Sequence, residues 1–371
     1  MKGNAMDRSD HRRILQLLPS ITRGDAVSND AMEIHRTLVR AGFESHIYAE
    51  YIGTGLDPQV VSPVNSLPEA GAGDVILFHL STGSHLQEVL RRCKAQGCKI
   101  LFRYHNITPP EFYRGYHPFL EKKCRDGRKE AGEMRDIPDA VLSVSDYNRQ
   151  DLLHMGYTCP MEIVPILIPF ADYEKTPNEE VLNRYKTGDT VNVLFTGRVA
   201  PNKKLEHVIA AFAAYYYNYN ANAKLFLVGN DAGTEPYRRN LQAYAEHLGL
   251  REKVIFTGHT TFPELLAYYR CADIFLCMSE HEGFCIPLVE AMYFDIPVIA
   301  LNAAAVEETL GGAGVLLPDS RPEEAAGKMA ALEEDSSLRE SVLAGQRERW
   351  KQFGQEKTAG RFLEVLQERI S

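Results

Sequence analysis

Two glutamates, Glu282 and Glu290, stand eight positions apart in the stretch SEHEGFCIPLVEAM. An upstream stretch, FTGRVAPNKKLE, adds two cations, Arg198 and Lys203. Arginine binds phosphate oxygens bidentately, lysine supplies a point charge, and carboxylates accept hydrogen bonds from sugar hydroxyls. Pro287 suits the first turn of a helix, whose free N–H groups attract a phosphate. These residue types predict a nucleotide-sugar site, although Glu290 alone could simply complement the helix dipole, worth about 0.3–1 kcal/mol.

Metal chemistry is not favoured by the sequence. There is no Asp-x-Asp pair, and the seven cysteines are scattered without a Cys-x-x-Cys pair, which is typical of reduced thiols rather than of a zinc site. We therefore expect no metal ion and no cofactor, with the phosphates and sugar hydroxyls meeting side chains directly.

Short apolar runs alternate with longer amphipathic segments, the pattern of a parallel α/β sheet. Helices are predicted at 27–41 and 84–95. The predicted strands lie at 13–18, 45–49, 74–79, 99–103, 140–144, 161–164, 191–197, 224–229, 253–258, 273–279 and 297–301. Three strands of the second half end in glycine, which lets the backbone turn sharply and a ligand approach closely. Repetition of this feature predicts one ligand-facing edge of a sheet.

The chain of 371 residues is long enough for two domains. A linker is expected near 168–180, where prolines and charges follow the last strand of the first half. The predicted organisation is an α/β protein with two doubly wound parallel-sheet domains, residues 1–170 and 171–352, facing a cleft. Residues 353–371 are predicted to form a C-terminal helix. An amphipathic pattern around it places Trp350, Phe353, Phe362 and Leu366 on roughly one side.

The stretches GRVAPNKK, FTGH and SEHEGFCIPLVEAM resemble those of retaining glycosyltransferases of family four, of the bacterial surface-polysaccharide type. The resemblance implies two Rossmann-like domains in the GT-B fold, with the last helix crossing back to the first domain. It implies that Glu282 contacts the donor sugar, Glu290 holds the ribose, and Arg198 and Lys203 stabilise the leaving diphosphate. The donor-binding residues implied in this way are Gly24, Arg198, Lys203, Glu282, Gly283, Phe284, Cys285, Ile286 and Glu290.

The sequence departs from the family at three positions. The family usually has glycine where Lys204, Cys285 and Asp295 stand. Cys285 puts in question how closely the backbone approaches the phosphates.

In the first half, the stretch PSITRGDAVSND places Gly24 where related enzymes turn a loop against the donor phosphates. It lacks Gly-x-Gly-x-x-Gly, which argues against a nicotinamide dehydrogenase. The resemblance implies a catalytic His105 at a strand end, next to Asn106, with Asp25, His105 and Asn106 on the acceptor side. His79 is a second candidate histidine, and a lone histidine is otherwise more often structural.

The expected partners are a nucleotide-sugar donor and a glycan or lipid-linked glycan acceptor, without nucleic acid, since the net charge is −9. Residues 91–135 nevertheless hold 12 basic and 5 acidic side chains. They form either solvated helix faces or a surface for an anionic partner. The polar N-terminus shows no signal peptide or membrane span. We expect a cytoplasmic protein, with peripheral contact to the inner face of a membrane as a hypothesis.

The predicted activity is a hexosyl transfer with retention, in which the donor phosphate helps to deprotonate the acceptor. Two other classes remain open. One is a sugar-nucleotide epimerase or glycan phosphorylase of the same architecture, although a phosphorylase should offer a cofactor lysine, and none is identifiable. The other is a non-catalytic two-domain sugar-nucleotide-binding protein.

Overall fold

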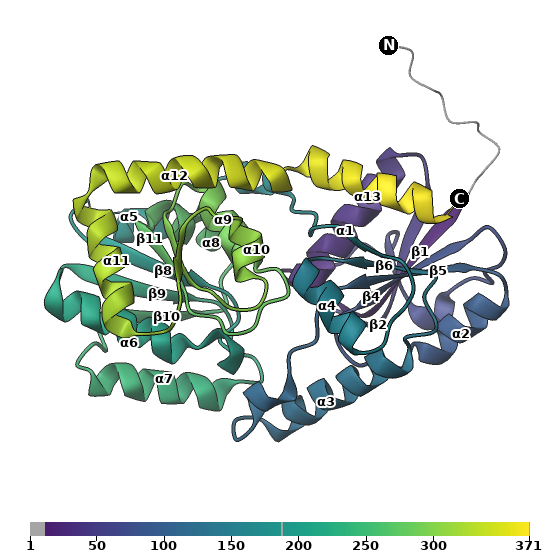
Figure 1. Ribbon diagram of the computed structural model, residues 1–371, viewed down its shortest axis with the longest axis horizontal. Coiled ribbons are helices and arrows are strands. Elements are labelled where there is room, and N and C mark those ends of the chain that lie inside the picture. The colour runs from purple at the N-terminus through teal and green to yellow at the C-terminus, as the bar shows by residue number, and fades with distance from the viewer. Residues whose placement is uncertain (1–11, 187, 371) are drawn as a thin grey trace, which may run out of the picture. The chain divides into compact units, whose positions relative to one another are not determined.

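The computed structural model describes residues 12–186 and 188–370. The expectation that the N-terminus holds no signal peptide concerns residues outside this range. The described residues form two compact α/β units (Figure 1). The first contains residues up to 107, 126–169 and those from 355; the second contains 108–125 and 170–354. Residues 108–125 were predicted to belong to the first domain, but they cluster with the second unit. None of the described helices is both long and apolar enough to cross a membrane.

The first unit is built on a seven-stranded sheet in the order β3-β2-β1-β4-β5-β6-β7, in which every pairing is parallel. Its strands are β1 (Arg13–Ile21), β2 (Glu44–Ile52), β3 (Val61–Pro63), β4 (Val75–Leu80), β5 (Lys99–Tyr104), β6 (Ala140–Ser143) and β7 (Met161–Ile163). The α-helices are α1 (Ala26–Arg40), α2 (Gln87–Ala95), α3 (Pro118–Glu133), which runs on from the second unit, α4 (Asp146–His154) and α13 (Gln355–Ile370). Short 3-10 turns are η1 (Val64–Ser66) in this unit and η2 (Pro110–Tyr113) in the second.

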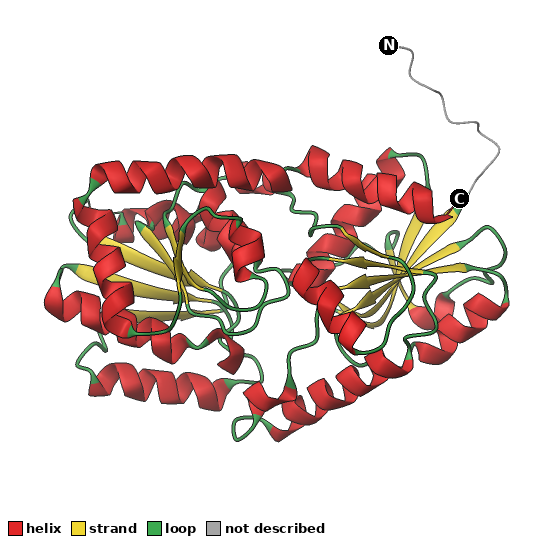
Figure 2. Cartoon of the chain, in the orientation of Figure 1, coloured by secondary structure: helices red, strands yellow, loops and turns green. Residues whose placement is uncertain are grey.

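The second unit repeats this plan with six parallel strands in the order β10-β9-β8-β11-β12-β13. The strands are β8 (Val191–Thr196), β9 (Ala223–Val228), β10 (Val254–Gly258), β11 (Ile274–Cys277), β12 (Val298–Leu301) and β13 (Val315–Leu317). The α-helices are α5 (Glu179–Tyr185), α6 (Leu205–Asn218), α7 (Glu235–His247), α8 (Phe262–Cys271), α9 (Ile286–Tyr293), α10 (Val306–Leu310), α11 (Pro322–Glu334) and α12 (Ser336–Trp350). The 3-10 turns are η3 (Phe170–Glu174), η4 (Pro201–Lys203) and η5 (Lys351–Phe353). In each unit helices cover both faces of the sheet (Figure 2).

The central strands are almost wholly apolar because both of their faces are covered. All six residues of β4 are buried, as are all four of β11 and of β12. Every predicted strand is present within a few residues. The three-residue edge strands β3 and β13 were not predicted. The expected linker near 168–180 is not open chain throughout, since η3 buries Phe170 and Tyr173 among the aromatic side chains of the second unit.

The C-terminal segment is two helices and not one amphipathic face. Trp350 ends α12 and packs on Phe170 of the second unit, with ring centroids 5.4 Å apart. After η5 and Gly354, α13 places Phe362 and Leu366 in the core of the first unit. At 3.6 residues per turn, Phe353 and Phe362, nine positions apart, fall on opposite sides of a single helix, so the four residues were never one continuous face.

The three departures from glycine coincide with left-handed backbone. The φ angles are +49° at Lys204, +69° at Cys285 and +59° at Asp295. Such angles cost residues with a Cβ about 1–2 kcal/mol, so the backbone itself explains why glycine suits these positions. Glycine is essential at the end of β9, where a Cβ on Gly229 would lie 1.9 Å from the carbonyl oxygen of Gly197.

Candidate functional site

The strand order reverses between β8 and β11 in the second sheet, and open α/β sheets bind ligands at the carboxyl ends of such strands. The loop after β8 carries Arg198 and Lys203, and the loop after β11 carries Glu282. Asn202 connects the two loops by two hydrogen bonds. Its side-chain amide donates to the main-chain carbonyl of His281 at 3.1 Å, and its main-chain carbonyl accepts from the N–H of Glu280 at 3.0 Å. The fold therefore brings Lys203 and Glu282 together, with Arg198 in the same loop as Lys203.

Lys203 and Glu282 form a buried ion pair. The ammonium lies 2.6 Å from Oε1 of Glu282, and the side chains are 19% and 9% exposed. Burial alone would lower the pKa of Lys203, but the charge of Glu282 and its hydrogen bond raise the pKa overall. Lys203 is thus a fixed positive charge whose partner is the predicted sugar-contacting carboxylate.

Arg198 is exposed, and its guanidinium donates to the carbonyl of Ala232 at 3.2 Å, so its side chain can be redirected at little cost. Gly283 and Phe284 lie in the loop that leads into α9. The carbonyl of Phe284 accepts a hydrogen bond from Thr309, and its ring packs edge-on against Phe353 at 5.3 Å. Cys285 is the N-cap of α9 and Ile286 its first residue, but no side chain caps this helix start.

Glu290 lies in α9 and is held by two tyrosine hydroxyls. Tyr173 donates to its Oε1 at 2.7 Å, and Tyr269 donates to its Oε2 at 2.5 Å. Burial raises the pKa of Glu290, while the two hydrogen bonds act in the opposite direction. Each carboxylate oxygen has two acceptor sites, so Glu290 can still accept from two further hydroxyls. Complementing the helix dipole is therefore not its only visible role.

Cysteines also gather at this site, which the sequence spacing did not predict. Cys277 ends β11, and its sulfur, that of Cys285 and a carboxylate oxygen of Glu282 all lie within 4.8 Å of one another. The cysteines are scattered in the sequence, as stated above, and two of them meet in space because the loop after β11 folds back over the strand end. The presence of this group of side chains says nothing about whether catalysis needs a metal ion, so metal independence stays a prediction.

In the first unit, Gly24 has a φ of +79°, and a Cβ there would meet open space. Asp25 is the N-cap of α1, accepting from the N–H of Ser28 at 3.0 Å and from its hydroxyl at 2.8 Å. This capping role is a structural reason for an aspartate here, beside the predicted acceptor role. Asn106 has a φ of +82° and donates to Oδ1 of Asn148 at 2.8 Å.

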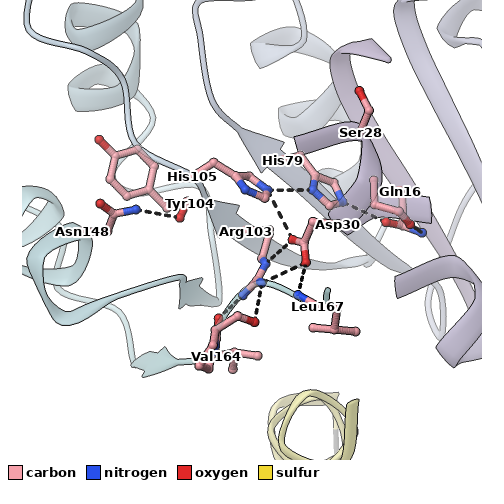
Figure 3. A network of polar contacts seen from close by, with 12 residues as sticks. Gln16, Ser28, Asp30, His79, Arg103, Tyr104, His105, Asn148, Val164 and Leu167 are labelled. Atoms are coloured by element: carbon pink, nitrogen blue, oxygen red, sulfur yellow. Dashed lines mark hydrogen bonds and ion pairs between the residues drawn. The ribbon is translucent and has the colours of Figure 1, made fainter. Parts of the chain in front are cut away.

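His105 belongs to a buried polar network at the carboxyl ends of β4 and β5 (Figure 3). Its Nε2 lies 3.1 Å from Nδ1 of His79, whose Nε2 lies 2.8 Å from Oε1 of Gln16. Asp30 accepts from the guanidinium of Arg103 at 2.8 and 3.2 Å and from the N–H of Leu167 at 2.8 Å. The ion pair of Arg103 with Asp30, which lies beside the two histidines, is wholly buried.

The direction of this hydrogen-bond chain follows from Gln16. Its Nε2 donates to the carbonyl of Ala31 at 3.2 Å, so its Oε1 accepts from His79. Burial lowers the pKa of both histidines well below the usual value, so each ring is neutral and carries one proton. His79 is then protonated on Nε2 and accepts at Nδ1 from Nε2–H of His105. The remaining Nδ1 of His105 is a buried acceptor that has no partner among the described residues.

The paired histidines predict a loss of stability in mild acid. The unfolded chain binds protons at histidine near pH 6.5, whereas the folded rings resist them, so the free energy of unfolding should fall as pH drops below about 6.5. Each histidine contributes up to about 1.4 kcal/mol per pH unit. Urea unfolding of the His79→Gln variant should show a shallower pH dependence than the wild type, with exposed His247→Gln as control. An unchanged slope in His79→Gln would contradict the neutral pair.

The basic segment is partly structural. In α3, the guanidinium of Arg128 lies 2.7 Å from Asp151, and that of Arg125 lies 2.5 Å from Glu121. Lys122 and Lys123 are exposed on the same helix, and the nearby Phe119 ring is 68% exposed. Solvated helix faces therefore account for part of the excess charge, while this end of α3 combines cations with an apolar ring.

Residues 179–356 match the family described as glycosyl transferases group 1. O-antigen chain mannosyltransferase B of Escherichia coli is 26% identical over 261 residues, 68% of this chain and 66% of that protein. D-inositol 3-phosphate glycosyltransferase of Paenarthrobacter aurescens is 26% identical over 252 residues, 66% of this chain and 61% of that protein. The chain thus spans less than two thirds of the length of these relatives.

Solved structures match over nearly the whole chain. Sucrose-phosphate synthase of Thermosynechococcus elongatus has a TM-score of 0.75 at 17% identity, covering 96% of this chain and 98% of that one. HepE of Anabaena in complex with UDP and glucose has a TM-score of 0.75 at 17% identity, covering 96% and 100%. These structures confirm the GT-B fold expected from the sequence, and the match of residues 179–356 supports the resemblance to glycosyl transferases group 1.

Proposed function

We propose that this protein is a retaining glycosyltransferase that moves a hexose from a nucleotide-diphosphate sugar to a glycan or lipid-linked glycan acceptor without a metal ion. The observation that carries the proposal is the pairing of Lys203 with Glu282, which unites the loops after β8 and β11 at the strand-order reversal. A fixed cation, an adjustable guanidinium at Arg198 and the start of α9 supply positive potential for a diphosphate.

Each residue has a part in this proposal. Arg198 and Lys203 stabilise the charge that develops on the leaving diphosphate, and Glu282 accepts from sugar hydroxyls. Glu290 holds the ribose through its two remaining acceptor sites. His105 offers a neutral Nδ1 that accepts from a hydroxyl and has nothing to donate to a phosphate or carboxylate, which favours an uncharged sugar. Gly24 approaches the donor phosphates, and Asp25 and Asn106 serve the acceptor side.

The names of the relatives support transfer of a sugar, to an O-antigen chain in one relative and to an inositol phosphate in the other. O-antigen chain mannosyltransferase B and D-inositol 3-phosphate glycosyltransferase both transfer sugars by name, and HepE was crystallised with UDP and glucose. We propose the same general reaction for this chain, with the donor base, the sugar and the acceptor to be identified by experiment.

The proposal is tested by titrating the protein with a panel of nucleotide sugars in EDTA, using calorimetry for binding and product analysis for hydrolysis or transfer. One donor should bind and be turned over with retained anomeric configuration. Interconversion of the sugar without transfer would favour an epimerase, and phosphate-dependent cleavage a phosphorylase. Binding without turnover would favour a binding protein, and activity lost in EDTA and restored by a divalent ion would contradict metal independence.

A cytoplasmic enzyme that uses a lipid-linked acceptor would meet it at the inner membrane face, and we propose that α3 makes this contact. Each basic residue near an anionic membrane contributes roughly 1 kcal/mol. Exchanging both Lys122 and Lys123 for glutamine should weaken sedimentation with anionic vesicles by about 30-fold at low salt. Arg128 stays unchanged because it binds Asp151. Absence of vesicle binding, or binding unaffected by the two changes, would favour an acceptor in solution.

A further inference from the structure

Two thiols and a carboxylate meet beside the Lys203 ammonium in the second unit. The sulfurs of Cys277 and Cys285 and an oxygen of Glu282 lie within 4.8 Å of one another. The two cysteines are 1% and 6% exposed, and Glu282 is 8% exposed. Two sulfurs bound to one tetrahedral zinc ion, each at about 2.3 Å, stand about 3.8 Å apart. The three ligand atoms therefore need to move by only about 1 Å to share an ion.

The backbone at Cys285 is a second, independent observation. Its φ of +69° favours glycine, yet a cysteine stands there. Two other residues with left-handed φ angles use their side chains in ion pairs: the ammonium of Lys204 lies 3.4 Å from Glu280, and the carboxylate of Asp295 lies 2.6 Å from Arg347, whereas Ala304, with a φ of +50°, has no such group. Cys285 caps no backbone group, and its side chain faces the thiol of Cys277. Strain of this kind gathers at functional positions, which points to a role for the thiol itself.

We propose that Cys277, Cys285 and Glu282 form a binding site for a thiophilic divalent cation such as Zn²⁺, and that an ion bound there blocks the use of Glu282. The fourth position is open for water or another ligand, as in zinc sites with three protein ligands. Two thiolates and one carboxylate carry three negative charges, and Zn²⁺ with the Lys203 ammonium balances them. Lys203 can thus keep its contact with Oε1 of Glu282 while the ion binds the other oxygen.

The protons also balance. Binding requires both thiols to ionise, so two protons leave for solvent and affinity rises with pH. The hydrogen bond from Cys285 lowers the pKa of Cys277, which favours the first ionisation. The hydrogen bond to Cys277, burial and the charge of Glu282 raise the pKa of Cys285 well above its usual value, and only Lys203 acts in the opposite direction, so the second ionisation depends on the bound ion itself.

The other group of possible ligands, Asp30, His79 and His105, is unsuited to a cation. Both oxygens of Asp30 accept hydrogen bonds from Arg103, a wholly buried cation, and both ring nitrogens of His79 are engaged in the chain to Gln16. The cluster in the second unit differs in two ways: its thiols are softer ligands, and its neighbouring cation, Lys203, is partly exposed and not wholly buried.

The site is tested with Cd²⁺ and Zn²⁺ on the metal-free full-length protein under reducing conditions and without substrate. Addition of Cd²⁺ should produce an ultraviolet sulfur-to-metal charge-transfer band that saturates at one equivalent of Cd²⁺. Calorimetry should show that Cys277→Ala weakens Zn²⁺ binding by at least about 100-fold, since losing even an outer-shell contact of a metal site costs about 10- to 100-fold. Cys285→Gly, which also relieves the backbone, should lose the band while remaining folded. Cys271→Ala, a buried cysteine of the same unit outside the cluster, should behave like the wild type.

The inhibition rests on the proposed transferase activity, whereas the charge-transfer band does not. One equivalent of Zn²⁺ should abolish transfer by the wild type, and Cys277→Ala should resist it. Absence of the band, or a band retained in both cluster variants, would overturn the site even if transfer is demonstrated. Metal binding that leaves transfer unchanged would overturn the capture of Glu282.

Discussion

Lys203→Ala is expected to lower turnover by about 100- to 1000-fold, the loss seen when one preorganised group facing a developing negative charge is removed. Arg198→Ala should have an effect of the same order, because both cations follow β8 and serve the proposed leaving diphosphate. Steady-state turnover with the donor found in the nucleotide-sugar panel measures both losses. The exposed Arg239, on α7, gives a matched control as Arg239→Ala, which should retain normal turnover.

The two variants should differ in stability. Arg198 is exposed, so its removal should leave the unfolding temperature nearly unchanged. Removing Lys203 leaves the buried carboxylate of Glu282 without its cation, a type of change that costs about 3–5 kcal/mol. The double variant Lys203→Met with Glu282→Gln separates stability from chemistry by removing both charges. Wild-type turnover in folded Arg198→Ala, or in a folded Lys203 variant, would contradict the assigned roles.

The second large effect concerns the two glutamates. Glu290→Gln should weaken binding of the free nucleoside diphosphate by about 10- to 100-fold, because hydrogen bonds to charged groups are worth about 1.5–3 kcal/mol. Glu282→Gln should leave that affinity nearly unchanged and lower transfer by about 100-fold. Calorimetry with the diphosphate, followed by turnover, distinguishes the variants. Equal losses of nucleotide affinity in both would mean that ribose and sugar roles are misassigned.

The contact of Tyr173 with Glu290 provides a control for the Glu290→Gln experiment, the variant Tyr173→Phe. The glutamine side chain at position 290 could accept from only one of the two tyrosine hydroxyls, so Glu290→Gln also disturbs Tyr173 or Tyr269. If Glu290 merely anchors these rings, Tyr173→Phe should reproduce the loss of nucleotide binding. We expect Tyr173→Phe to bind the diphosphate almost normally, because it frees an acceptor site on Glu290 without removing the carboxylate.

Much of the fold follows from local patterns in the sequence. Buried parallel strands are continuous apolar runs, and the glycine after β9 is required because a Cβ on Gly229 would collide with Gly197. The edge strands β3 and β13 have only three residues each, too short for an apolar run to be recognised. Strand existence was therefore predictable where burial is complete on both faces, and not at the edges.

The site was predictable only in part, since its residues meet through tertiary contacts. Arg198, Lys203 and Glu282 share loops with recognisable spacing. The hydroxyls of Tyr173 and Tyr269 reach Glu290 from η3 and α8, and no local pattern marks them. The sequence named His79 and His105 but not their link, for which Gln16 was a signal, as a polar residue inside the apolar run RILQLL. Its meaning depends on β1 and β4 being neighbours in the sheet, with Gln16 opposite Leu77.

The first unit is assembled from three separated segments, and this sets an order for folding during synthesis. Phe362, Val365 and Leu366 of α13 pack with Ile34 and other residues of the first unit, yet they are made after the whole of 170–354. Until α13 leaves the ribosome, the surface that it covers is exposed to chaperones and to other nascent chains. The second unit, most of which is one continuous segment, can complete its core earlier. The closing contact of the first unit has a high sequence separation, so we expect it to form late.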